Sequence, residues 1–88
     1  MESQKHQRQR IYALLNESLC GMTRLQISRI LGIERAVVCW RVKELRERDL
    51  LWVATVDLDP LTNARAEFLT TRKDVMEKYE KKTDNIFE

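Results

Sequence analysis

The sequence contains few residues that interrupt regular secondary structure. Its 88 residues include only two glycines and one proline. Because glycine and proline punctuate helices and strands, their scarcity predicts long, regular elements joined by short connections. Hydrophobic residues make up 43% of the chain, an ordinary fraction for a folded protein. We therefore expect one small domain over residues 1–88.

Residues that bind metals or perform catalysis are also scarce. Cys20 and Cys39 lack the spacing of a metal or redox motif, and His6 is the single histidine. The sequence shows no nucleophile–base pair and no glycine-rich phosphate loop. We therefore expect a protein that is not an enzyme, with no cofactor and no metal. Two isolated thiols favour a reducing, cytoplasmic location.

Long apolar runs are absent as well, and the positive charge is unevenly distributed. No run approaches the ~20 residues that span a bilayer, and residues 1–10 do not resemble a secretory signal. The net charge is +2. Residues 1–53 carry ten basic and six acidic side chains, whereas residues 54–88 carry six and eight. Any nucleic-acid surface is therefore expected in the N-terminal part.

Three amphipathic helices are predicted in that part. The first runs from about residue 2 or 3 to residue 19. The second begins at Thr23, a good N-cap with Gln26 at capping-box spacing, and ends at Gly32. The third begins near Glu34 and runs to about Arg48. The inward-facing residues predicted for the second and third helices are Ile27, Ile30, Leu31, Val38, Val42 and Leu45.

A β-hairpin and a last helix are predicted after the third helix. Residues 50–57 are rich in strand-forming side chains, residues 59–64 have turn chemistry, and residues 65–70 form the returning strand. A helix is then expected from residue 71 to about residue 82. The predicted order is helix, helix, tight turn, helix and hairpin.

This order resembles the winged helix-turn-helix of MarR-type transcriptional regulators and of small phage and prophage proteins. The resemblance covers roughly residues 11–70, and its matching positions are Thr23, Ile27, Ile30, Leu31, Gly32, Ile33, Val38, Val42, Leu45, Leu50, Leu51 and the strand end at 68–70. It implies an α+β fold with a three-helix core and a β-hairpin wing, followed by an additional C-terminal helix and tail over 71–88. It also implies a regulator that binds double-stranded DNA.

The third helix is the predicted recognition helix, because the major groove of B-DNA admits one α-helix. We expect Arg35 to pair with guanine, Ala36 to pack on a thymine methyl, and Lys43 to contact phosphate or base. Thr23 and Arg24 lie at a helix N-terminus, where an anion is favoured. The predicted DNA-binding residues are Thr23, Arg24, Arg35, Ala36, Cys39, Trp40, Lys43 and Arg65.

Two side chains of this helix leave alternatives open. Trp40 either stacks against sugar or base, or packs under the wing or in an oligomer interface. Arg41 stands where the resemblance implies an apolar core residue. We expect its alkyl chain to lie along Leu45 and its charge to reach the surface.

The wing is poor in basic residues. It offers Arg65 beside Asp57 and Asp59, and carboxylates near phosphate weaken binding. The favoured interpretation is that the hairpin closes the core with Trp52, Val56 and Phe68.

An oligomer and a protein partner are further hypotheses. The apolar stripe of Val75, Met76 and Tyr79 predicts a homodimerisation helix, since two-fold dimers read paired half-sites. The alternative is that this helix packs on the first helix of its own chain. As an alternative function, Trp40 and the acidic wing form a contact surface for another protein.

Overall fold

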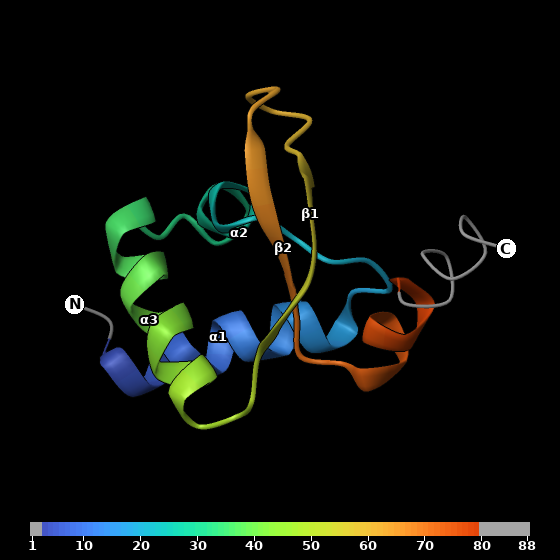
Figure 1. Cartoon of the computed structure of the whole chain (residues 1–88). Coiled ribbons are helices and arrows are strands. Elements are labelled where there is room, and N and C mark those ends of the chain that lie inside the picture. Colours follow the sequence, from blue (N-terminus) through green and yellow to red (C-terminus); the bar gives the residue numbers. More distant parts are fainter. Residues whose placement is uncertain (1–2, 80–88) are drawn as a thin grey trace, which may run out of the picture.

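The computed structural model describes residues 3–79. The order of elements is α1 (Gln4–Glu17), α2 (Arg24–Leu31), α3 (Arg35–Glu47), β1 (Trp52–Leu58) and β2 (Arg65–Thr70), and residues 73–79 are again helical. Figure 1 shows the hairpin projecting away from α1 and α3 as a wing. The predicted winged helix with an additional helix is confirmed. Within residues 3–79, no helix has the length and hydropathy to cross a membrane.

Local capping sets the bounds of α1 and α2. The Ser3 hydroxyl accepts a hydrogen bond from the His6 amide and begins α1. Thr23 and Gln26 form the predicted capping box, with Gln26 Oε1 accepting from the Thr23 amide at 3.0 Å. Gly32 has a left-handed φ of 66°, a backbone conformation that costs glycine little energy because glycine has no Cβ. The chain can therefore enter α3 directly after α2.

The hydrophobic core lies between the three helices and the base of the wing. Its members are Ile11, Leu15, Ile27, Ile33, Val38, Val42, Leu45, Leu51 and Leu69. Met22 joins the sheet through two backbone hydrogen bonds with Leu69, of 3.0 and 2.7 Å. The neighbouring Gly21 approaches β2 so closely that a Cβ there would lie 3.0 Å from Phe68 Cβ. A larger residue at this position would press against β2, so the close crossing of the sheet favours glycine.

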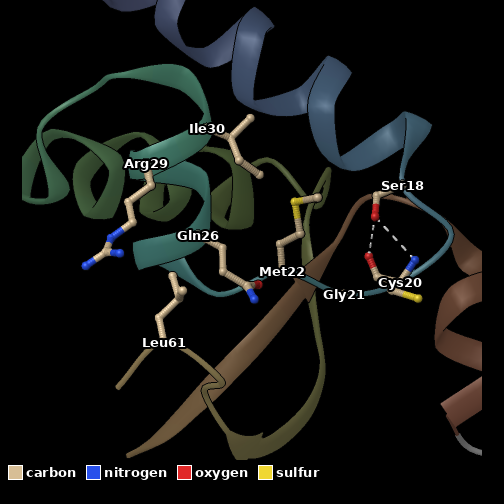
Figure 2. A pocket seen from close by; sticks show the side chains of 8 residues that line it. All are labelled: Ser18, Cys20, Gly21, Met22, Gln26, Arg29, Ile30 and Leu61. Carbon is tan, nitrogen blue, oxygen red and sulfur yellow. Dashed lines mark hydrogen bonds between the residues drawn. The ribbon is translucent and has the colours of Figure 1, made fainter. Parts of the chain in front are cut away.

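The structure corrects the predicted inward position of Ile30, whose side chain is 57% exposed. Only one ridge of the eight-residue α2 faces the core, and Ile27 occupies it. Ile33, in the turn after α2, fills the next core position. Ile30 instead lines a hollow of about 440 Å³ with Met22 and Leu61 (Figure 2).

The hairpin closes the core at its base and not along its length. In the antiparallel register Trp52 lies opposite Thr70, and a β-bulge falls between Val53 and Thr55. Leu51 and Leu69 are the buried residues here, while Val56 is 50% exposed. The prediction that Val56 closes the core was wrong, because Val56 lies too far along the projecting wing.

The loop at the wing tip is ordered by one buried carboxylate, that of Asp59. The Asp59 Oδ1 atom accepts a hydrogen bond from the Leu61 amide at 2.8 Å, and the Asp59 backbone carbonyl accepts one from the Asn63 amide at 2.7 Å. Asn63 takes a left-handed φ of 57°, which asparagine tolerates. The acidic character expected of this loop is thus reduced, since Asp59 is 2% exposed.

The last helical residues lie against the end of α1. Arg72 Nη1 donates to the Asn16 carbonyl at 3.3 Å, and Val75 is 2% exposed. The Arg72 guanidinium also bonds to Asp74 and holds the pKa of that carboxyl below its ordinary value. The part of the predicted helix beyond residue 79 lies outside the described residues.

Candidate nucleic-acid interface

The surface of α3 divides into an inward and an outward face, as its spacing predicts. Val38, Val42 and Leu45 are buried. The side chains of Arg35, Ala36, Trp40 and Lys43 are exposed, and Cys39 is half-buried. The structure therefore presents the predicted recognition residues together on one helix surface.

Basic side chains gather on the flank of α3 that faces the start of α2. Arg24, Cys39, Lys43, Arg46 and Glu47 line a single hollow of about 490 Å³. Three cations against one carboxylate make this hollow attractive to an anion. We call this hollow, together with Arg35 and Ala36 at the start of α3, the basic face. Arg46 was not among the predicted DNA-binding residues, although it lies one turn after Lys43 and seven residues after Cys39.

The wing supplies a counter-charge to the basic face. Arg24 Nη1 lies 2.9 Å from Glu67 Oε1, and the Glu67 side chain is 40% exposed. Because this pair is partly exposed to solvent, it contributes only modestly to holding Arg24 in place. Arg24 is therefore positioned beside α3 and remains able to contact another anion.

Thr23 is placed differently from the other predicted contacts. It is 1% exposed, and its hydroxyl donates to Asp59 Oδ2 at 2.8 Å. The same hydroxyl accepts from the Gln26 amide at 3.2 Å. A carboxylate of the wing loop thus lies at the α2 N-terminus, where negative charge is stabilised. The Thr23–Asp59 hydrogen bond fastens the wing to the helix pair.

Trp40 lies on the opposite flank of the outward face, towards the start of α1. Its side chain is 68% exposed, and it lines a hollow with Gln4, Lys43 and Glu47. It does not pack under the wing of its own chain, so that prediction was wrong, and its place in an oligomer interface stays a prediction. The exposed indole is available to DNA or to another protein.

Arg41 corrects a second expectation, because its charged end does not reach the surface. The residue is 5% exposed, and its Nε lies 2.7 Å from Glu44 Oε1. Glu44 Oε2 also accepts from Arg8 Nη1 at 2.8 Å. Glu44, one turn along α3, supplies a half-buried counter-charge, so the guanidinium stays inside. Its Nη1 has no hydrogen-bond partner among residues 3–79.

The remaining predicted residues lie away from α3. Arg65 is exposed at the start of β2, opposite Leu58. Met76 and Tyr79 are half-buried, and Val75 is already covered within the single chain. The part of the chain that the structure describes contains no group of three side chains able to hold a metal ion.

The element order and the exposed α3 define a winged helix-turn-helix protein. No protein-family profile and no curated protein matches the chain. Among solved structures it is similar to two mutants of S. aureus MepR. One, bound to an oligodeoxyribonucleotide, has 17% identity and a TM-score of 0.47, and the other has 19% and 0.49. Both matches cover 94% of this chain and 57% of the MepR chain, so this chain spans less than two thirds of that length.

Proposed function

We propose that this protein binds double-stranded DNA in a sequence-specific way and regulates transcription, with α3 in the major groove. One observation carries the proposal: the exposed face of α3 borders a hollow in which Arg24, Lys43 and Arg46 gather. A single helix with cations along one flank matches the width and charge of the groove. The fold alone would not support this function, since one fold hosts many activities.

The residues of the outward face of α3 and of its basic flank have distinct roles in this proposal. Arg35 and Ala36 lie in the first turn of α3, from which a docked recognition helix reaches base edges. Lys43, Arg46 and Arg24 follow the flank, where phosphates border the groove. Trp40 and Cys39 complete the contact surface. Three neutralised phosphates would give a log–log salt slope of about −2.7 per chain.

The wing contributes one direct contact in this proposal, from Arg65. The Asp59 carboxylate, which would repel phosphate if exposed, is turned towards Thr23. The main task of the wing is to fix the start of α2, and with it Arg24, beside α3. Thr23 therefore supports the site by holding the wing in place, and in this proposal its hydroxyl does not contact DNA.

The deciding experiment measures DNA binding by fluorescence anisotropy with a labelled mixed-sequence duplex over a salt series. We expect the double variant Arg35→Ala/Lys43→Ala to bind at least about thirtyfold more weakly, from the loss of two charged contacts worth roughly 1 kcal/mol or more each. Lys73→Ala/Lys78→Ala removes the same charge from exposed positions on the last helix and should bind like the wild type.

Two results would overturn the proposal. One is the absence of measurable duplex binding at about 50 mM salt, where phosphate contacts are strong. The other is equal weakening by the two double variants, which would show that net charge alone drives binding. Selection of bound sequences from a random duplex pool then tests sequence specificity.

A homodimer formed through the last helix is part of the proposal. Met76 and Tyr79 are half-buried and would be covered by a partner subunit, whereas Val75 fixes the helix to its own chain. Sedimentation velocity of the wild type and of Met76→Glu tests this. A concentration-independent monomer in both proteins would end the dimer proposal and leave DNA binding by a monomer intact.

The second candidate function is a protein contact made by Trp40. The 68% exposure of this indole favours it, since tryptophan is enriched among residues that anchor interfaces. The acidic wing, reduced to Asp57 and the paired Glu67, contributes less than its sequence indicates. Trp40→Ala separates the candidates: it should weaken duplex binding only modestly, but it should abolish capture of a protein partner at any salt concentration.

A further inference from the structure

A second basic groove lies between α1 and the end of α3, and it shares no lining residue with the hollow of the basic face. Lys5, Arg8 and Tyr12 follow one stripe of α1 at helical spacing, and Arg48 and Leu50 border them from the other side. The groove has a volume of about 520 Å³. Its α1 stripe covers two helical turns, or about 10 Å. We call it the α1 groove.

The floor of the α1 groove is apolar and partly open to solvent. Leu45 is 3% exposed and belongs to the core, Tyr12 packs against that core, and Leu50 is 42% exposed. The sequence predicted that Leu50 would start a strand. The strand begins two residues later, because Asp49 turns the chain with a φ of 57°. An exposed leucine is left beside a tyrosine ring.

Among residues 3–79, the rim of the groove carries positive charge alone. Its ionisable side chains other than Tyr12 are Lys5, Arg8 and Arg48, and no carboxylate of the described residues lines it. Arg8 is already paired with Glu44. Lys5 and Arg48 are exposed, and no carboxylate among residues 3–79 forms an ion pair with either of them. Two uncompensated cations thus flank an apolar floor.

We propose that the α1 groove binds an acidic amphipathic segment of a partner protein. Such a segment, when helical, presents apolar anchors at one-turn spacing with carboxylates beside them. Its anchors would cover Leu50 and Tyr12, and its carboxylates would meet Lys5 and Arg48. An exposed leucine floor gives DNA phosphates no favourable contact, whereas the basic face proposed for DNA is lined mainly by charged groups.

The two basic surfaces can be occupied together. Arg35 and Ala36 open α3 and Arg48 ends it, so a segment in the α1 groove leaves the outward face of α3 uncovered. The proposal therefore does not depend on DNA binding. A partner held here would be brought to the DNA that α3 binds.

The test uses NMR titration of the ¹⁵N-labelled chain with a synthetic helical peptide of Glu, Ala and Leu. A control peptide has Gln in place of Leu and the same charge. We expect shift changes at Lys5, Arg8, Gln9, Tyr12, Arg48 and Leu50, with affinity at least about tenfold above that of the control peptide. Lys5→Glu/Arg48→Glu should reduce affinity at least about tenfold, whereas Lys73→Glu/Lys78→Glu should leave it within twofold.

Four outcomes would overturn the proposal. Equal binding of the two peptides would mean that charge alone attracts them. Shift changes confined to Arg24, Lys43 and Arg46 would place the peptide on the basic face. The same shifts on raising protein concentration without peptide would identify a second copy of the chain as the occupant. Loss of duplex affinity in Lys5→Glu/Arg48→Glu beyond that of Lys73→Glu/Lys78→Glu would make the groove a DNA contact.

Discussion

The two flanks of α3 carry the same kinds of side chain in opposite states. On the flank facing α2, Lys43 and Arg46 are exposed and share a hollow with Arg24. On the flank facing α1, Arg41 is buried against Glu44, which also binds Arg8. One helix therefore directs some cations outward to solvent and holds another in a structural ion pair.

The difference shows that the position of a counter-charge decides whether an arginine is buried in an ion pair or exposed to solvent. Burying a guanidinium costs several kcal/mol unless a carboxylate offsets the loss of hydration. Glu44 is available one turn from Arg41 and again to Arg8, so both arginines of that flank are held in ion pairs within the chain. In the α2-facing flank, Glu47 lines the hollow and Glu67 pairs with Arg24, whereas Lys43 and Arg46 keep their charges exposed to solvent.

The largest expected effect comes from breaking the buried flank. Glu44→Ala leaves the Arg41 guanidinium buried without its counter-charge, and we expect the free energy of unfolding to fall by about 2 kcal/mol. The value lies below that of a fully buried pair because the Glu44 side chain is 28% exposed. Urea denaturation measures it.

Two variants control this prediction. Glu47→Ala removes an exposed carboxylate from the same helix and should change the free energy of unfolding by less than about 0.5 kcal/mol. Arg41→Met/Glu44→Ala removes both charges and should recover most of the loss. A double variant less stable than Glu44→Ala would show that the unpaired guanidinium does not destabilise the fold. The proposed difference between the two flanks would then be wrong.

A smaller effect is expected where the wing is fastened to the exposed flank. Thr23→Ala removes the α2 cap and the hydroxyl bound to Asp59, which should lower the free energy of unfolding by about 1.5 kcal/mol. Thr23→Ser keeps both hydrogen bonds and should retain most of this stability. Thermal unfolding of the two variants checks the expectation, and equal losses would show that the methyl group matters and the hydroxyl does not.

The smallest expected effect tests a single cation of the exposed flank. Arg46→Ala should weaken duplex binding about fivefold for every sequence and reduce the salt slope by about 0.9, as one lost phosphate contact predicts. Stability should not change, since Arg46 is exposed. Arg48→Ala, two residues further on in the α1 groove, is the matched control, and an equal loss there would erase the distinction between the two basic surfaces.

Local signals allowed much of this fold to be predicted. The capping box at Thr23, the left-handed Gly32 and the shift from helical to strand patterning after Asp49 each depend on neighbouring residues. For the same reason the outward position of Arg35, Ala36, Trp40 and Lys43 followed from helical spacing. These features need no knowledge of distant parts of the chain.

Contacts between residues far apart in the sequence could not be predicted from such local patterns. Ile30 has the spacing of a core residue, but Ile33 takes the core position. Arg41 was expected to reach solvent, although its partner Glu44 lies one turn along the same helix. Glu44 is also bound by Arg8 of α1, and only the fold brings these two helices together. Asp59 was counted as a repulsive charge, although it caps a wing loop and bonds to Thr23, 36 residues away.

The sequence by itself determined the helices, their caps and the face of α3 that looks outward, because periodicity and capping act over one or two turns. Only the tertiary structure decided which charges are buried, which cations share a hollow, and that an apolar groove with a basic rim lies beside α1. Such pairings depend on which helices and loops meet, and local spacing does not carry that information.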